Sequence, residues 1–339
     1  MFDLNKIVRK NIQALQPYSS ARDEFSGDAN IFLDANENPF GNLNRYPDPY
    51  QNKLKEILSK IKNISANNMC IGNGSDELID LAFRIFCNPG KDKVITFSPS
   101  YGMYQVLANI NDVAVIDILL NENFQINIDA LEKFYEEENI KMLLICSPNN
   151  PTGNNIDDIE KIIINFKGIV IVDEAYIDFS HKSSLLNKVA KYPNLIVLQT
   201  LSKAWALAAA RVGIAFAQSS IISLFNKVKP PYNISSINEA AAIASLNNFK
   251  QFEVTKKILY QQKKIVIDAL SKLSFVIKIF PSDANFLLIK TTDATSLYQY
   301  LLSKKIIVRN RHSIIENCIR ISIGTAEENK KLIEALKQF

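Results

Sequence analysis

Short apolar runs alternate with segments of helical periodicity along the middle of this chain. Six of these runs are rich in valine, isoleucine and leucine, a composition typical of buried strands. The expected strands are residues 93–97, 113–118, 141–146, 168–173, 195–200 and 212–217. Strands that alternate with helices form βα units, so we predict a mostly parallel sheet. The direction of the last strand is left open, because it could also be antiparallel.

Three helical segments stand out around these runs. Residues 50–62 carry leucine and isoleucine at helical spacing, and residues 249–273 form a longer helical pattern. Ser75 precedes Asp76 and Glu77, which favours a helix that begins there with Ser75 as its N-cap.

The last third of the chain has a different pattern. Strands are expected at residues 275–280, 285–289, 306–309 and 318–323, and helices at 295–303 and 326–337. We therefore predict an N-terminal arm (residues 1–30), a large domain (31–230) and a smaller α+β domain (231–339). The length of 339 residues agrees with domains of about 100–200 residues each.

Composition excludes several classes of function. The net charge of +4 arises from 39 basic and 35 acidic residues without a basic block, so no nucleic-acid partner is expected. Two histidines and four scattered cysteines offer no paired metal ligands, so no metal site is expected. The N-terminus lacks the apolar core of a signal peptide, and no apolar run reaches the ~20 residues of a membrane span. We expect a cytoplasmic protein that does not contact a membrane.

Lys203 is the first candidate for chemistry. It follows the buried run 195–200, and it lies close in sequence to Thr200, Ser202 and Arg211. A lysine at such an edge loses solvation and can act as an amine nucleophile, while hydroxyls and a guanidinium suit a phosphate monoester. Lysine and phosphate seat together are what pyridoxal phosphate requires. Taken alone, a lysine after a strand is more often an ordinary surface residue, so the interpretation depends on the other segments of the chain.

A second candidate phosphate seat consists of Gly74, Ser75 and Asp76. Glycine allows close approach of backbone N–H groups, and a helix N-terminus favours an anion. The same residues also fit an ordinary helix start. No strand is expected before residues 72–77, and the glycine spacing is not that of a dinucleotide site.

Polar residues follow three other expected strands. Asp173 ends the run 168–173 and could hold a proton on a pyridine nitrogen, with Tyr176 in reach of the ring oxygen; a helix N-cap is the alternative for Asp173. A turn rich in proline follows the run 141–146, and the amide of Asn149 or Asn150 could donate to a ligand oxygen there; a plain turn is the alternative. Tyr101 could stack on a planar cofactor or pack in the core.

Together these segments resemble one family. The ordered motifs are DANENPFG (34–41), RYPDP (45–49), GNGSDE (72–77), SPNNPTG (147–153), VDEAYIDF (172–179) and TLSKAWALA (200–208). Nearly the whole chain resembles the fold-type-I, class-II pyridoxal-phosphate aminotransferases, and within them the histidinol-phosphate branch. The resemblance implies an α/β fold, with a large domain built on a mostly parallel seven-stranded sheet covered by helices and a smaller α+β C-terminal domain.

The resemblance also implies a role for each matching residue. Lys203 would form the Schiff base with pyridoxal 5'-phosphate and move the substrate proton, and Asp173 would pair with the ring nitrogen. Asn149 and Tyr176 would bond the ring oxygen, and Tyr101 would stack on the ring. The phosphate would be held by Gly74, Ser75, Asp76, Thr200, Ser202 and Arg211, and by Tyr46 of a second copy in a homodimer. The substrate would meet Tyr18, Asn36, Arg309 and Arg320.

The activity implied is transamination of L-histidinol phosphate with 2-oxoglutarate, which yields imidazole-acetol phosphate and glutamate in histidine biosynthesis. Two related activities stay open: an aromatic or broad-specificity aminotransferase, and a decarboxylase of the threonine-phosphate type. The partners implied are these small molecules and a second copy of the chain.

Overall fold

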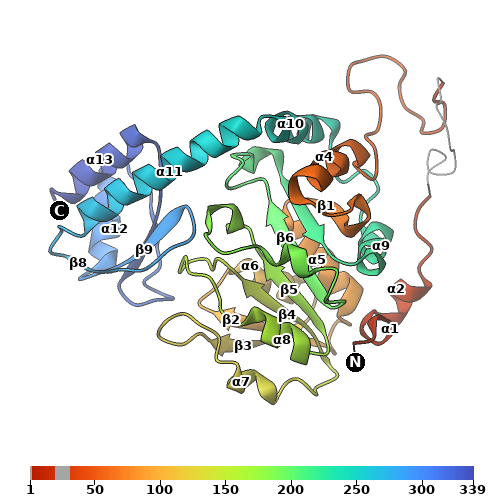
Figure 1. Ribbon diagram of the computed structural model, residues 1–339, viewed down its shortest axis with the longest axis horizontal. Coiled ribbons are helices and arrows are strands. Elements are labelled where there is room, and N and C mark those ends of the chain that lie inside the picture. Colours follow the sequence, from red (N-terminus) through yellow and green to blue (C-terminus); the bar gives the residue numbers. More distant parts are fainter. Residues whose placement is uncertain (1, 20–30) are drawn as a thin grey trace.

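The computed structural model describes residues 2–19 and 31–339, so residues 1 and 20–30 of the predicted arm lie outside the described residues. A large domain occupies the centre of the molecule, and a smaller one is joined to it by the long helix α11 (Phe249–Leu270) (Figure 1). Among the described residues, no helix is both long and apolar enough to cross a bilayer.

The large domain is built on a seven-stranded sheet in the order β1-β7-β6-β5-β4-β2-β3. Its pairs β2–β3, β2–β4, β4–β5 and β5–β6 are parallel, whereas β7 runs antiparallel to β6 and β1. The strands are β1 (Met69–Asn73), β2 (Lys93–Ser98), β3 (Ala114–Leu119), β4 (Ile140–Cys146), β5 (Ile169–Asp173), β6 (Leu195–Thr200) and β7 (Val212–Phe216). The predicted mostly parallel sheet is confirmed, and the last strand, whose direction the sequence left open, is antiparallel.

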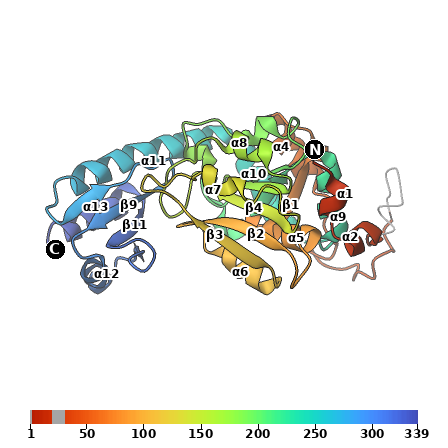
Figure 2. The same cartoon turned by 90° about the horizontal axis from the view of Figure 1, so that it is seen from below.

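Helices cover both faces of this sheet (Figure 2). One face packs against α4 (Asn52–Lys62), α8 (Ile159–Asn165) and α10 (Ser236–Asn247). The other packs against α5 (Ser75–Phe86), α6 (Met103–Ile110) and α9 (Ser219–Val228), with the short helices α1 (Leu4–Ile7) and α2 (Lys10–Ala14) at its edge. Because both faces are buried, the central strands read as continuous apolar runs rather than alternating ones.

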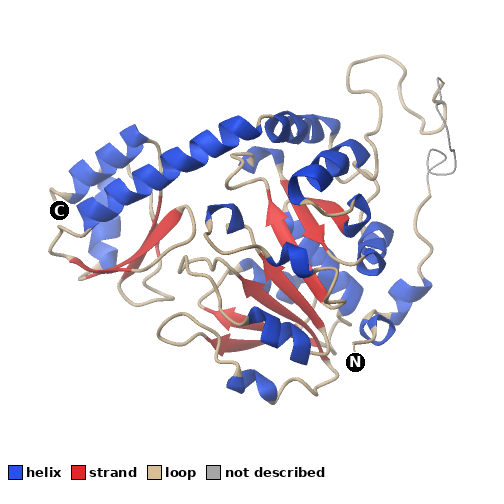
Figure 3. Cartoon of the chain, viewed as in Figure 1, coloured by secondary structure: helices blue, strands red, loops and turns tan. Residues whose placement is uncertain are grey.

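The small domain is a four-stranded antiparallel sheet in the order β10-β11-β9-β8 with helices against one face (Figure 3). Its elements are β8 (Val276–Ile279), β9 (Phe286–Thr291), α12 (Ala294–Ser303), β10 (Arg309–Asn310), β11 (Cys318–Ser322) and α13 (Ala326–Leu336). On β11, Ile319 and Ile321 enter the core of this domain, and Arg320 lines a cleft beside the large domain.

Four sequence-based expectations differ from the structure. A strand, β1, does precede the 72–77 segment, although its short run Met-Cys-Ile-Gly-Asn gave no clear signal. Gly74 rather than Ser75 is the N-cap of α5, and Ser75 is its first helical residue. Helix α10 was not expected. Its alanines favour a helix but form no clear stripe of large apolar residues at helical spacing. The strand expected at 306–309 begins only at Arg309, because Ile306 bonds back to Leu301 at the end of α12.

The packing of α10 bears on the domain division. Its buried residues Ala242 and Leu246 belong to the core of the large domain, as does Phe252 early in α11. The first residue of the small-domain core in this helix is Val266. The packing therefore places the change from the large-domain core to the small-domain core within α11, on the C-terminal side of the predicted 230/231 division.

We expect Gly213→Ala to destabilise the fold by about 1–3 kcal/mol through overpacking. A Cβ at Gly213 on β7 would lie 2.4 Å from the carbonyl carbon of Gly74 and 2.4 Å from the nitrogen of Ser75. Gly102→Ala is the matched control, because its Cβ would meet nothing within 4 Å. Urea unfolding of both variants tests this, and equal stabilities would contradict it.

Candidate active site

An open cleft with a volume of about 610 Å³ lies at the carboxyl ends of the parallel strands. This edge is where open α/β sheets bind their ligands. The residues predicted from the sequence that line the cleft are Ser75, Asp76, Tyr101, Asp173, Tyr176, Thr200, Ser202, Lys203, Arg211, Arg309 and Arg320. The structure thus brings together eleven residues from segments that are far apart in the chain.

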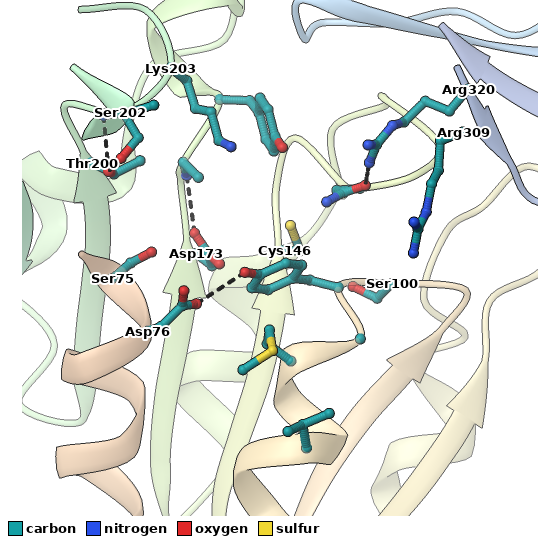
Figure 4. A pocket seen from close by; sticks show the side chains of 18 of the residues that line it. Ser75, Asp76, Ser100, Cys146, Asp173, Thr200, Ser202, Lys203, Arg309 and Arg320 are labelled. Atoms are coloured by element: carbon teal, nitrogen blue, oxygen red, sulfur yellow. Dashed lines mark hydrogen bonds between the residues drawn. The ribbon is translucent and has the colours of Figure 1, made fainter. Parts of the chain in front are cut away.

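Two groups of side chains face each other across this cleft (Figure 4). Lys203, Asp173 and Asp76 come from the large domain, whereas Arg309 and Arg320 reach in from the β10–β11 hairpin of the small domain. The acid and base groups therefore lie on the side of the large-domain sheet, opposite the two arginines of the small domain.

Asp173 is the deepest charged group of the cleft. It ends β5 and is only 3% exposed, and burial raises the pKa of its carboxyl to about 6. Two donors oppose this rise: the hydroxyl of Tyr104 donates to Oδ2 at 2.9 Å, and the backbone N–H of Ala175 donates to Oδ1 at 3.1 Å. No ion pair joins Asp173 to a lysine or arginine in the described part of the chain. A buried carboxylate of this kind suits the protonated nitrogen of a pyridine ring.

Lys203 lies in the turn after β6. Burial lowers the pKa of its amine, and the nearby positive charge of Arg320 lowers that pKa further. Its Nζ lies 5.6 Å from the centre of the Tyr176 ring. The hydroxyl of Thr200 accepts from the N–H of Ser202 at 3.1 Å and so fixes the turn that carries Lys203. The amine is therefore more available as a base than an exposed lysine would be.

The start of α5 forms an anion seat. Gly74 has a φ of +81°, and a Cβ there would lie 2.5 Å from Nη2 of Arg211, so glycine lets the guanidinium lie across the helix start. No side chain caps this helix, which leaves N–H groups of its first turn for a ligand. Arg211 is 3.7 Å from Asp76, whose other oxygen accepts from the Tyr101 hydroxyl at 3.0 Å. Glycine, guanidinium, hydroxyls and free N–H groups together fit a phosphate monoester.

Tyr176 and Tyr101 both retain their phenolic protons. Burial raises the pKa of each hydroxyl, and the carboxylate of Asp76 raises that of Tyr101 further. A protonated Tyr176 at the cleft wall can donate to an oxygen of a bound ring. Tyr101 makes an edge contact with Tyr104, with ring centres 5.5 Å apart, which holds the Tyr101 ring in the cleft.

Five predicted site residues are not among those that line the cleft within this chain. Gly74 is one of them, and it lies directly beside the guanidinium of Arg211. Asn149 is 1% exposed, and its amide nitrogen donates to the carbonyl of Pro99 at 2.9 Å and to the hydroxyl of Thr152 at 2.7 Å. Both of its N–H groups are therefore engaged below the cleft floor, and its bond to a ring oxygen stays a prediction. Tyr18, Asn36 and Tyr46 lie outside the cleft, in the segment that precedes α4; Tyr46 stacks on Tyr232 with ring centres 4.4 Å apart.

Two functional residues, Tyr104 and Arg311, were missed from the sequence, and of the two candidate amides it offered the structure favours the second. Tyr104 bonds Asp173 and lies one helical turn after Tyr101, a spacing that could have suggested it. Asn150, rather than its neighbour Asn149, lines the cleft and accepts a hydrogen bond from Nη1 of Arg320. Arg311 also lines the cleft, two residues after Arg309 and thus on the same side of a strand.

We expect Asp173→Asn to remove a pH-dependent loss of stability from the cofactor-free protein. The folded state holds the Asp173 proton up to about pH 6, whereas the unfolded chain releases it near 3.8, so this group lowers stability as pH rises between these values. Relative to the parent, the free energy of unfolding of the variant should rise by about 2 kcal/mol between pH 4 and pH 7. Urea titrations at both pH values measure this gain, with Asp268→Asn on the exposed side of α11 as control. A difference between parent and variant that is independent of pH would contradict it.

Comparison with known proteins agrees with this geometry. The family model described as aminotransferase class I and II matches residues 24–336. The histidinol-phosphate aminotransferase of Flavobacterium psychrophilum is 51% identical over 99% of both chains. That of Bacteroides thetaiotaomicron is 50% identical over 100% of this chain and 99% of its own. The crystal structure of the Clostridium acetobutylicum histidinol-phosphate aminotransferase superimposes with a TM-score of 0.79 at 26% identity, and the match covers 88% of this chain and 91% of that one.

The family match spans most of the chain, and it includes the lysine, the aspartate and the anion seat that line one cleft. The chain belongs to the class I and II aminotransferase family.

Proposed function

We propose that this protein is a pyridoxal-phosphate-dependent aminotransferase that acts on L-histidinol phosphate in histidine biosynthesis, with 2-oxoglutarate as the amino acceptor. The observation that carries the proposal is the meeting of Lys203, Asp173 and the Gly74–Arg211 anion seat in one cleft, opposite arginines that can bind an anionic substrate. Relatives about 50% identical over the full length bear the name of this activity.

The chemistry that pyridoxal phosphate supplies when bound is an aldehyde for the substrate amine and a ring that accepts electrons from the substrate Cα. Arg211, Ser75 and Ser202 would hold its phosphate at the start of α5. The carboxylate of Asp173, oriented by Tyr104, would keep a proton on the ring nitrogen. Tyr176 would donate its phenolic proton to the ring oxygen.

Lys203 would move the reacting proton. Because its pKa is lowered, a larger fraction of its Nζ is uncharged at neutral pH and can take the proton from the substrate Cα. The same nitrogen can return this proton on the cofactor side. Arg309 and Arg320 would hold the anionic group of the substrate, and a planar guanidinium can fork onto a phosphate or a carboxylate.

We further propose a cytoplasmic homodimer in which Tyr46 contributes to the site of the second copy. Large apolar side chains are exposed around Tyr46, which is a property of surfaces that contact another protein. These include Ile31, Leu33, Phe40, Leu43 and Ile237. A second copy on this surface would also account for the position of Tyr18 and Asn36 outside the cleft of their own chain.

A substrate panel tests the proposed reaction. Purified protein with pyridoxal phosphate and 2-oxoglutarate should form glutamate fastest from histidinol phosphate and much more slowly from phenylalanine. Threonine phosphate should release no carbon dioxide. Preference for phenylalanine would favour the aromatic aminotransferase instead, and release of carbon dioxide from threonine phosphate would favour the decarboxylase.

We expect Lys203→Ala to lower transamination by about 10²–10⁴-fold, because no other lysine and no histidine lines the cleft among the described residues. Borohydride should fix the cofactor to the Lys203 peptide of the parent but not to the variant, as mass spectrometry would detect. Lys203→Arg is the matched control: it keeps the positive charge, but a guanidinium does not lose its proton and should be equally inactive. Normal turnover by either variant would refute this role of Lys203.

A further inference from the structure

Three arginines share one side of the β10–β11 hairpin. Arg309 lies directly opposite Arg320 in the antiparallel pairing. Arg311 follows two residues later, and its N–H donates to the carbonyl of Cys318 at 2.9 Å, so the hairpin pairing extends to it. Alternation along a strand places Arg309 and Arg311 on the same side, and all three line the cleft.

The positive charge of this cluster is not balanced by the protein. In the described ranges, Arg211 is paired with Asp76, but no carboxylate forms an ion pair with any of the three hairpin arginines. Burial, together with the positive charges of Arg320 and Arg309, lowers the pKa of Arg311 to about 10. Like charges opposite each other on paired strands repel, so the cluster lacks a negative partner.

Two hydrogen-bond donors of the cluster are also unused. The Nε atoms of Arg311 and Arg320 are buried without a hydrogen-bond partner. Arg320 is otherwise held in place, because it donates to Asn150 and lies over the ring of Phe286 at 5.2 Å. No such contact fixes the guanidinium of Arg311 among the described residues. An anion bound in the cleft would balance this positive charge and could accept hydrogen bonds from the unused donors.

The number of guanidinium groups indicates which anion fits. One planar guanidinium can satisfy the two oxygens of a singly charged carboxylate through parallel bonds. A phosphate monoester has three terminal oxygens and a charge near −1.5 to −2, so it can accept from further guanidinium groups.

We infer that Arg311 is a specificity-determining residue, which with Arg309 and Arg320 forms a three-guanidinium site that favours a phosphate monoester over a carboxylate. The inference rests on the proposed function for the identity of the phosphorylated substrate. It assigns to Arg311 the distinction between this substrate and the dicarboxylic acid that shares the cleft.

Arg311→Gln tests this assignment, because glutamine keeps a polar side chain but removes the charge. The kcat/KM for histidinol phosphate should fall by about 10–100-fold, mainly through KM. The values for unphosphorylated histidinol and for glutamate should stay close to those of the parent. Arg84→Gln is the matched control, since Arg84 pairs with Asp80 on α5 outside the cleft. Equal losses on all three substrates, or no loss on any, would overturn the assignment.

A second measurement does not depend on turnover. In the resting holoenzyme the cofactor phosphate occupies the Gly74–Arg211 seat, so added inorganic phosphate reports on the hairpin arginines. Phosphate should raise the melting temperature of the parent more than that of Arg311→Gln. Without phosphate, the variant should be at least as stable as the parent, because a repelling charge is gone.

Loss of stability in phosphate-free buffer, with an unchanged response to phosphate, would mean that Arg311 is only structural. The proposed function and the role of Arg311 can be refuted independently of each other. If the parent does not turn over histidinol phosphate, the proposed function is wrong, yet the response to phosphate still decides the role of Arg311.

Discussion

The site depends on the parallel pairing of β4, β5 and β6. In this register Cys146 lies beside Asp173, and Asp173 lies beside Leu198, so the three strands end at the same edge. Polar residues that follow each strand are thereby brought together, although they lie far apart in the sequence. The antiparallel β7 adds Arg211 to this edge, because Gly213 pairs with Thr200 at the end of β6.

Burial of the sheet on both faces then sets the chemistry of these residues. The strands are apolar on either side, so Asp173 at the end of β5 loses water, and Lys203 in the turn after β6 is partly desolvated at the wall of the cleft. Their pKa values move toward each other, which makes the carboxyl a proton acceptor near neutrality and the amine a usable base. The bond from Tyr104 limits this shift at Asp173 and fixes the carboxylate in place.

The two domains contribute different groups to the cleft. The large domain supplies a rigid edge with the acid, the base and the anion seat. The small domain supplies three arginines on one hairpin, which is joined to the rest of the chain through β9, β11 and the helix α11. In the proposed reaction, the groups for chemistry and those for substrate selection would therefore be carried by different hydrophobic cores, and the two domains meet where Arg320 bonds Asn150.

The sequence by itself determined the order of strands and helices, the mostly parallel sheet and the set of lysine, aspartate and tyrosine residues, because these follow from local periodicity and motifs. It did not reveal β1 or α10, whose runs are too short or too rich in alanine to give a periodic signal. Only the tertiary structure decided that Tyr104 bonds Asp173, that the Asn149 amide is engaged elsewhere and that Arg311 joins Arg309 and Arg320. Such pairings depend on contacts between residues up to 170 positions apart, as in the bond of Arg320 to Asn150, and no local pattern records them.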